Sequence, residues 1–597
     1  MAEPPPPSPH PDRDRDLASV QQARTLARQA RTAQQEYAEF SQEAVDAVVD
    51  AVAAAMRPQA EALARLAVDE TGYGNVGDKT RKNLFAADRV YEFIRPMRTV
   101  GVVRRIEEKK IVEIAEPFGV VAAIIPSTNP VATAIYKVLI SLKARCAIVL
   151  SPHPAAERCI TRAAELMRDA ATRAGSPAGT ISWMTNVTLE GTQELMRARE
   201  VAVILATGGM GLVRAAYSAG KPAYGVGPGN APAYIERTAD IALAVRHVVA
   251  GKTFDYGVLC SSENSVVVDQ DIAEATRAEF VRQGAHFLSE PEMQGLAAVL
   301  VTPQRLPNPA LVGKAATVIA ERAGITVPPG TRVLIAPLGG VGRDFPLSIE
   351  KLCPVLSFYV VRDWREGCER CKEILRYGGM GHTMAIHSRD EEVILQFGLH
   401  KPAYRIVVNT PTTHGSIGLS TDLDPALTLG CGGFGGNITS DNITPRHLLN
   451  LKRLAYGVRP VELDALPAQV PATAAVAVRK SAQPAEAPAA DVVRRQVRAF
   501  LAARGFSATA EPAAAPPAWA AAATPSSTGP TSASPPGPPP AHALTPEPAL
   551  QPPPLAFVCE EDVRDAIRAG RRLRLAPKAI VTPAARDLAD AHKVFAD

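Results

Sequence analysis

Short apolar segments that alternate with helical segments constrain the fold of this chain most strongly. Four segments have the length and apolar composition of buried strands: residues 118–125 (FGVVAAII), 147–150, 180–184 and 201–206 (VAVILA). Residues 155–174 and 189–197 between them have helical periodicity. Strands that alternate with helices indicate a parallel, doubly wound sheet, which binds ligands at the carboxyl ends of its strands. The pattern predicts a dinucleotide-binding domain, although GxGxxG is absent.

Segments of other kinds surround this first alternation. Residues 17–97 carry apolar side chains at helical spacing and are expected to form helices that pack on a sheet. Residues 100–116 alternate apolar and charged side chains, as in a hairpin with one solvated face. A second alternation of strands and helices covers residues 235–429 and predicts a second α/β domain. A glycine-rich loop follows it, and we expect a short strand and a helix after that loop.

Composition changes abruptly after residue 460. The Ala/Pro-rich segments 461–490 and 506–556 cannot bury enough apolar surface to fold, and are predicted to be disordered linkers. Residues 491–505, which lie between these two linkers, are predicted to form one amphipathic helix from the spacing of their apolar residues. Residues 557–597 predict a helix, two short strands and a second helix that begins with Thr582 as N-cap and Pro583. This last segment is too small for a substantial core of its own, so we expect it to dock on a partner.

Overall composition excludes several classes of function. The chain has 597 residues and a formal net charge of +4, and it carries no basic cluster with interleaved aromatic residues, so nucleic-acid binding is not expected. It has no run of 18 apolar residues and no signal-peptide pattern, so we expect no membrane segment and a cytoplasmic location. Eight scattered cysteines suit reduced thiols. Cys368 and Cys371 form a CxxC without a second ligand pair, so we expect a structural role and no metal.

Cys260 lies in residues 252–268, KTFDYGVLCSSENSVVV, between a polar turn and an apolar, strand-like run. A thiol is a good nucleophile only as thiolate, and its unperturbed pKa is about 8.5, so this role requires nearby N–H dipoles or a base, and access. A free cysteine is more commonly a small buried hydrophobe. The segment alone leaves both interpretations open.

Residues 252–268 resemble the catalytic-cysteine segment of the aldehyde dehydrogenase superfamily, in particular of its CoA-acylating branch. That branch includes the aldehyde dehydrogenase half of the bifunctional aldehyde/alcohol dehydrogenases. The resemblance covers about residues 17–457 and includes AEPFGVVAAIIPSTNPVATAIYKVLISLK at residues 115–143. It implies an α/β aldehyde dehydrogenase fold with a Rossmann-like cofactor domain, an α/β catalytic domain and a β oligomerisation arm, and hence a homo-oligomer.

The resemblance also implies domain boundaries. The NAD-binding domain would cover residues 17–99 and 117–236, after a disordered N-terminus at residues 1–16. The oligomerisation arm would comprise residues 100–116 and 437–460, and the catalytic domain residues 237–436.

Three residues match catalytic positions of the resembled family. Cys260 would be the nucleophile, and Asn129 in PSTNP would stabilise the oxyanion together with the Cys260 backbone N–H. His382, in GGMGHTMAIHS, would assist the CoA thiol or simply line the channel. From sequence alone, Asn129 before Pro130 is also a plausible turn residue, and a lone histidine is more often structural.

Seven further residues match cofactor contacts. Glu350 in EKLCPVL would hold the nicotinamide ribose, Ser151, His153 and Pro154 in SPHP the adenosine half, and Thr207, Gly208 and Gly209 the pyrophosphate. Hydrolytic relatives commonly carry a lysine in the SPHP segment and this chain does not, which leaves the preference between NAD and NADP open. We expect NAD.

A residue that is missing indicates the reaction. Hydrolytic members of the family carry a water-activating glutamate 34 residues before the catalytic cysteine, and here that position is Val226. Without this base, water should attack the enzyme thioester slowly, because a positioned base is typically worth roughly 10² to 10⁴ in rate. Coenzyme A brings its own thiol and can accept the acyl group.

The sequence therefore predicts an NAD-dependent, CoA-acylating dehydrogenase of a short aldehyde. Its tail resembles the encapsulation peptides of bacterial microcompartment enzymes, so residues 491–505 or 557–597 would bind shell proteins or co-packaged enzymes. A merely solubilising tail is the alternative for that segment. A hydrolytic aldehyde dehydrogenase and a catalytically idle scaffold remain alternatives for the whole chain.

Overall fold

The computed structural model describes residues 11–459, 555–558, 560–581 and 583–595. The chain divides into two compact units, Met1–Ala468 and Gln469–Asp597. The predicted linker at 461–490, the predicted helix at 491–505 and residues 506–554 of the predicted linker at 506–556 lie outside the described residues. The last two residues of that linker, 555 and 556, belong instead to a strand, β16 (Leu555–Val558). Within the described part, no helix has both the length and the apolar composition needed to cross a membrane.

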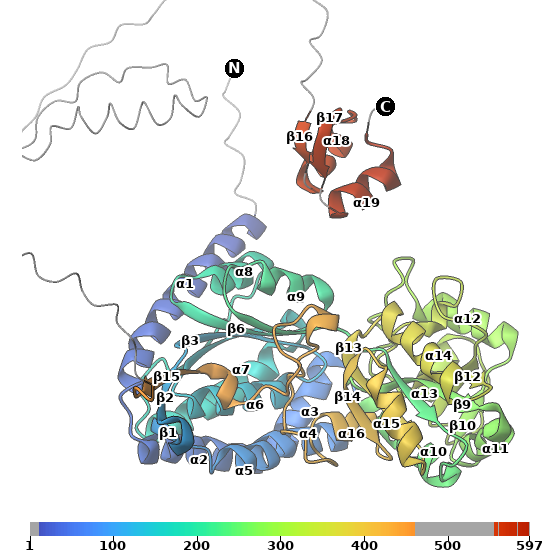
Figure 1. The fold of residues 1–597 in the computed structure, drawn as a ribbon, viewed down its shortest axis with the longest axis horizontal. Helices are drawn as coiled ribbons and strands as arrows, with labels where there is room; N and C mark the ends of the chain where they lie inside the picture. Colours follow the sequence, from blue (N-terminus) through green and yellow to red (C-terminus); the bar gives the residue numbers. More distant parts are fainter. Residues whose placement is uncertain (1–10, 460–554, 559, 582, 596–597) are drawn as a thin grey trace, which may run out of the picture. The chain divides into compact units, whose positions relative to one another are not determined.

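Five parallel strands form one sheet of the first unit, in the order β5-β4-β3-β6-β7 (Figure 1). They are β3 (Val120–Ile125), β4 (Ala147–Pro152), β5 (Ile181–Trp183), β6 (Val201–Thr207) and β7 (Ala223–Val226). All four pairings between neighbours are parallel. The parallel sheet expected from the apolar segments is confirmed, and β7 is an additional strand.

Helices cover both faces of this sheet (Figure 1). One face packs on α1 (Pro11–Tyr37), α8 (Leu189–Arg197) and α9 (Met210–Tyr217), and its core includes Val120 and Ala122 of β3. The other face packs on α2 (Gln42–Met56), α6 (Pro130–Lys143) and α7 (Glu157–Arg173), with Val121 and Ala123 of the same strand. Successive residues of β3 thus enter opposite cores, as strand geometry requires.

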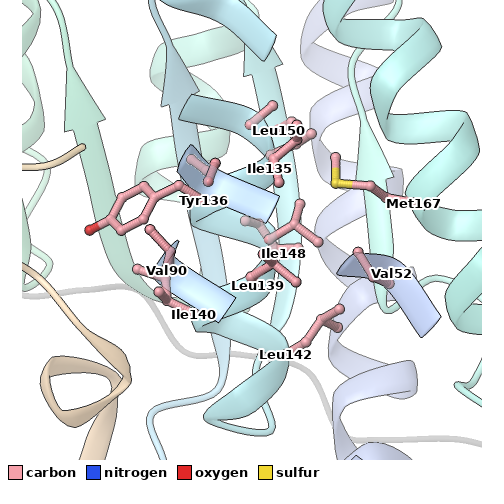
Figure 2. Packing of buried hydrophobic residues seen from close by; sticks show 14 of the residues in the cluster. Val52, Val90, Ile135, Tyr136, Leu139, Ile140, Leu142, Ile148, Leu150 and Met167 are labelled. Carbon is pink, nitrogen blue, oxygen red and sulfur yellow. The ribbon is translucent and has the colours of Figure 1, made fainter. Parts of the chain in front are cut away.

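Helix α6 is buried along its whole length and forms the centre of the larger core. Figure 2 shows Ile135 and Leu139 of α6 beside Ile148 and Leu150 of the sheet. This packing holds the start of α6, at Pro130, rigidly against the carboxyl end of β3. The residue just before that start is Asn129.

Seven parallel strands form the second sheet, in the order β10-β11-β12-β9-β8-β13-β14. They are β8 (Ala231–Ile235), β9 (Glu263–Asp269), β10 (Ala285–Phe287), β11 (Val333–Pro337), β12 (Val355–Val361), β13 (Gly381–His387) and β14 (Ala403–Val408). On one face pack α10 (Ile241–Thr253) and α11 (Ala273–Arg282). The other face is covered by α12 (Glu290–Leu300), α13 (Ala316–Arg322), α14 (Trp364–Tyr377) and α15 (Glu391–Leu399).

Two predicted boundaries differ from the structure. β8 lies within residues 117–236, which were assigned to the cofactor domain, but it pairs with β9 and β13 of the seven-stranded sheet. Helix α1 begins at Pro11 and so includes residues 11–16 of the segment predicted to be disordered. Both errors have the same cause. Strand pairing and helix packing depend on residues far away in the sequence, so the residues at a domain boundary do not indicate them.

The residues assigned to the arm form a small antiparallel sheet, with strand order β1-β2-β15. β1 (Gly101–Ile106) and β2 (Ile111–Pro117) make the predicted hairpin, and β15 (Leu449–Ala455) pairs along β2. The glycine-rich closing segment was expected to contain a strand and then a helix, but a 3-10 turn at Pro445–Leu448 precedes β15 instead. β15 is almost entirely exposed on this chain. The function of this sheet in joining subunits stays a prediction.

The described part of the second unit has the order β16 (Leu555–Val558), α18 (Glu560–Arg568), β17 (Leu575–Val581) and α19 (Pro583–His592). β16 and β17 pair in parallel, and seven buried apolar residues form a small core, among them Val563 of α18 and Ala589 of α19. Both helices of this segment were predicted from the sequence. β16 was missed, and Thr582, the expected N-cap, lies outside the described residues.

The N-terminal helical region also contains three shorter helices: α3 (Ala60–Thr71), α4 (Val76–Phe85) and α5 (Tyr91–Ile94). α4 packs against α6 and contacts the 3-10 segment Phe254–Gly257 that follows α10. It therefore links the two sheets close to the position of Cys260.

Candidate active site

A cavity of about 500 Å³ lies between the two sheets. The carboxyl ends of β3, β4, β6 and β7 contribute one wall, as is usual for ligand sites of parallel sheets. The segments that precede β9 and β12 contribute the other wall. Nine of the ten predicted site residues line it: Asn129, Ser151, His153, Pro154, Thr207, Gly208, Gly209, Cys260 and Glu350. The tenth, His382, contacts Cys260.

Cys260 occupies a tight turn between α10 and β9, and this partly buried residue lines the cavity. The described residues contain six other cysteines, and all of these are buried. The Cys260 backbone is packed against Gly229, where an added Cβ would collide with the Cys260 carbonyl oxygen and come within 3.1 Å of the His382 ring. Only glycine fits at position 229, so this close packing fixes Cys260 beside His382.

His382, on β13, brings Nε2 to 3.1 Å from Cys260 Sγ, and its Nδ1 lies 3.0 Å from Thr383 Oγ1. Burial, with a smaller contribution from the positive charge of Arg405, lowers the pKa of His382 to about 3. The imidazole is therefore neutral at neutral pH. With its proton on Nδ1, it donates to Thr383 and presents a free lone pair at Nε2 to the thiol.

Burial, together with the nearby Glu350 and Cys431, raises the pKa of Cys260 to about 12. Arg405 and the Cys260 backbone N–H act in the opposite direction but do not compensate for burial. The ligand-free thiol is consequently protonated at neutral pH. Cys260 Sγ can act as a nucleophile only if its proton leaves as the bond between Sγ and the substrate carbon forms. His382 Nε2 is in place to accept that proton.

Asn129 occupies the N-cap position of α6, but its side chain does not cap the helix. The amide oxygen instead accepts a hydrogen bond from Lys82 Nζ at 2.5 Å, and Nδ2 donates to Thr128 Oγ1 at 3.2 Å. An amide nitrogen carries two hydrogens, so a second donor remains on the side that lines the cavity. This donor and the thiol belong to the same cavity.

The predicted adenosine and pyrophosphate contacts lie at three strand ends. Ser151 Oγ, at the end of β4, is 2.9 Å from Thr192 Oγ1, and His153 Nδ1 accepts from the Ala155 N–H at 3.1 Å. Burial lowers the pKa of His153, so it is neutral. Thr207 Oγ1, at the end of β6, is buried without a hydrogen-bond partner. An orphaned hydroxyl in the cavity wall fits a polar ligand that supplies the missing bond.

Gly208 and Gly209 follow Thr207 and lead into α9, with Gly209 at the N-cap. A Cβ at Gly209 would meet open space, so the backbone at Gly209 is accessible from the cavity, whereas the Gly208 N–H donates to the Val226 carbonyl at 3.4 Å. The positive end of a helix with accessible N–H groups suits a phosphate. The residues present therefore fit a dinucleotide that extends from the β4 end to Cys260.

Among the described residues that line the cavity, Glu350 alone is acidic. Its Oε1 accepts the Gly229 N–H at 2.8 Å, and burial raises its pKa to about 7. Val226, at the position of the hydrolytic base in the resembled relatives, also lines the cavity and is 2% exposed. The wall at that position is therefore apolar.

Sequence reasoning missed Lys82 and Asp255, which are buried directly behind Asn129. Burial lowers the pKa of Lys82 to about 8, with Asp255 opposing the shift. Two charged residues in otherwise unremarkable segments carry no local signal of burial. The sequence does place two lysines of α4 three residues apart on one helix face, but this spacing indicates a shared face and not burial.

Comparisons with known proteins agree with this arrangement. Residues 14–295 match the model of the aldehyde dehydrogenase family. The bifunctional aldehyde-alcohol dehydrogenase AdhE of Escherichia coli K12 is 41% identical over 444 residues, which cover 74% of this chain and 50% of that protein. The chain thus spans about half the length of that relative.

Two solved structures are similar over most of the first unit. An acetylating aldehyde dehydrogenase from Geobacillus thermoglucosidasius is 51% identical, with a TM-score of 0.74, and the match covers 75% of this chain and 99% of that one. A propionaldehyde dehydrogenase from the fucose utilisation bacterial microcompartment of Clostridium phytofermentans is 27% identical, with a TM-score of 0.66, covering 73% and 97%.

The fold and the cavity define a cysteine-containing, dinucleotide-binding α/β protein of the dehydrogenase type. The chain belongs to the aldehyde dehydrogenase family, and its similarity extends to acetylating members of that family. The aldehyde dehydrogenase fold expected from the sequence is confirmed.

Proposed function

We propose that this protein is a CoA-acylating aldehyde dehydrogenase that converts an aldehyde, CoA and NAD into acyl-CoA and NADH. The observation that carries the proposal is the 3.1 Å contact between Cys260 Sγ and His382 Nε2, in a cavity where the hydrolytic base is replaced by Val226. The name of the Geobacillus relative, an acetylating aldehyde dehydrogenase, supports the acylating activity, and the name of AdhE supports aldehyde oxidation or reduction.

In this proposal Cys260 Sγ attacks the aldehyde carbon while its proton passes to His382 Nε2. Asn129 Nδ2 donates to the oxygen that becomes negative. A nicotinamide bound in the cavity supplies the chemistry of a hydride acceptor, and the acyl group is left on Cys260 as a thioester. His382 releases the proton it accepted to solvent. The CoA thiol then attacks the thioester, so the C–S bond to Cys260 breaks as the new one forms, and the proton of the CoA thiol passes to Cys260 Sγ as acyl-CoA leaves.

We favour NAD over NADP on the charge of the cavity. A 2′-phosphate is usually held by an arginine or a lysine, and the described residues that line the cavity include neither. The one basic side chain at the β4 end, His153, is neutral because burial lowers its pKa.

The test is NADH formation with and without CoA. Without CoA, we expect one NADH per active site and then turnover slower by about 10²-fold or more, because no base activates water. With CoA, turnover should continue and acyl-CoA should accumulate. Replacing NAD with NADP should lower kcat/KM. Steady NADH formation without CoA, with free acid as product, would contradict the acylating function.

One observation favours the hydrolytic alternative. Glu350 lines the cavity, and its raised pKa of about 7 suits a general base. Against this, its Oε1 is engaged by the Gly229 N–H. The hydrolytic alternative predicts that Glu350→Gln abolishes acid formation in the absence of CoA, whereas the acylating one predicts little acid to abolish.

We further propose that the C-terminal segment docks the enzyme on microcompartment shell or on co-packaged enzymes. The microcompartment origin of the Clostridium phytofermentans relative supports this location. The small β16-α18-β17-α19 fold offers a defined surface, with Arg571 and Arg572 exposed between α18 and β17. Two adjacent exposed arginines suit an acidic partner surface.

Deleting residues 491–597 should abolish co-purification with shell while leaving turnover intact. The double variant Arg571→Glu/Arg572→Glu is the matched control, since it keeps the tail length and reverses the charge. A docking surface predicts loss of co-purification in both, whereas a solubilising tail predicts a loss of solubility only on deletion. Unchanged co-purification after deletion would rule out docking.

A further inference from the structure

Two lysines and one aspartate form a buried charged cluster behind Asn129. The exposed fractions are 3% for Lys79, 2% for Lys82 and 0% for Asp255. Lys79 Nζ lies 3.0 Å from Asp255 Oδ2, and Lys82 Nζ also bonds to that oxygen. Each buried ion costs several kcal/mol of desolvation, and one carboxylate neutralises only one of the two ammonium groups. Asp78, outside this cluster, also raises the pKa of Lys82, so the second ammonium group relies on a more distant carboxylate.

The carboxylate at the centre of this cluster is held from several sides. Asp255 Oδ1 accepts the Asn75 N–H at 2.8 Å, and the Asp255 N–H donates to Asp78 Oδ2 at 2.8 Å. Asp255 has a left-handed φ of 49°, a conformation that costs of order 1 kcal/mol or more in a non-glycine residue. A Cβ at Gly74 would collide with its carboxylate. The backbone just before Cys260 is thus fixed against α4.

Lys82 is the member of the cluster that reaches the site. Its Nζ donates to Asn129 Oδ1 at 2.5 Å, whereas Lys79 Nζ donates to the Thr128 carbonyl at 3.0 Å. An ammonium group has three donors and no acceptor, so it accepts only the oxygen face of an amide. Lys82 therefore determines which end of the Asn129 amide faces the cluster and which end faces the cavity.

We propose that Lys82 is a positioning residue that holds the Asn129 amide with its NH₂ directed at the developing oxyanion. Asp255 fixes Lys82, and it also fixes the turn that leads to Cys260. It therefore holds the two oxyanion donors, Asn129 Nδ2 and the Cys260 N–H, at a constant position relative to each other. The positive charge behind the amide oxygen also polarises the amide and strengthens its N–H as a donor. The proposal rests on the oxyanion step of the proposed function and assigns a residue that acts through Asn129.

The experiment uses p-nitrophenyl acetate, which acylates Cys260 without cofactor. Sγ attacks the ester carbonyl, an oxyanion forms, and p-nitrophenolate leaves. Lys82→Met keeps the side-chain length and removes the ammonium, and we expect it to slow the acylation burst by about 10²-fold, as for loss of an oxyanion donor. Alkylation of Cys260 by iodoacetamide forms no oxyanion, so its rate should not change.

A double-mutant cycle with Asn129→Ala separates positioning from general damage. If Lys82 acts through Asn129, Lys82→Met should cost little in the Asn129→Ala background. Lys79→Met is the matched control, since it removes the other buried ammonium of α4. It should lower the melting temperature about as much as Lys82→Met does, but it should slow acylation less. Additive effects in the cycle, or equal slowing of acylation and alkylation, would overturn the proposal. Because this readout needs neither NAD nor CoA, it stays interpretable if the proposed function fails.

Discussion

Replacing Cys260 with serine is expected to lower kcat for NADH formation by at least about 10⁴-fold, because the substitution removes the nucleophile. A serine hydroxyl beside His382 ionises far less readily than a thiol. Cys431→Ser is a suitable control, since Cys431 is buried near the same Arg405 and affects the pKa of Cys260 without lining the cavity. We expect that variant to retain most of its activity.

The covalent intermediate provides a second measurement for the same residue. Mass spectrometry after a single turnover without CoA should find an acyl group on the peptide that contains Cys260. An acyl adduct on another residue, or turnover that survives in Cys260→Ser, would refute the assignment of the nucleophile. If no acyl adduct formed on any residue, the result would favour the alternative of a catalytically idle scaffold.

The raised pKa of Cys260 makes its reactivity dependent on pH in a definite direction. Since the pKa of about 12 lies above the range from pH 7 to pH 10, the thiolate fraction should rise about tenfold per pH unit across that range. Cys559 is the one cysteine outside the described residues, so it is replaced by serine to leave Cys260 as the thiol that is followed. In this Cys559→Ser background, alkylation by iodoacetamide should follow the slope without a plateau. A plateau that begins below pH 8 would indicate a preformed thiolate and imidazolium pair instead.

Much of the fold could be predicted because its signals are local. The apolar segments of β3, β4, β5 and β6 and the amphipathic pattern of α8 are visible within windows of a few residues. The cavity could be located too, since the carboxyl ends of parallel strands meet at one edge. The placement of the nine cavity residues follows from that rule and from the family motifs.

The remaining features depend on contacts between distant residues. Lys82 and Asp255 are 173 positions apart, and neither segment indicates that its charge is buried. The left-handed backbone at Asp255 has no sequence signal such as a glycine. β8 was assigned to the wrong sheet because its apolar composition fits either one, and only pairing with β9 and β13 decides.

His382→Ala is expected to lower kcat by about 10² to 10⁴, the usual value of a positioned proton acceptor. KM for NAD should change little, because His382 is not among the residues that line the cavity. His387 offers a matched control on the same strand. It is 1% exposed, burial lowers its pKa to about 3 as for His382, and its ring lies 5.7 Å from His247 rather than beside the thiol.

The burst of NADH distinguishes two functions of His382. If the imidazole accepts the Cys260 proton, His382→Ala should slow the first turnover in the absence of CoA. If it acts only on the CoA thiol, the burst rate should be unchanged and only the steady rate should fall. The 3.1 Å contact to Sγ favours the first outcome, since a neutral base at that distance can accept the proton as Sγ attacks the aldehyde, before CoA arrives. Equal losses in His382→Ala and His387→Ala would instead point to damage of β13 and would remove His382 from the chemistry.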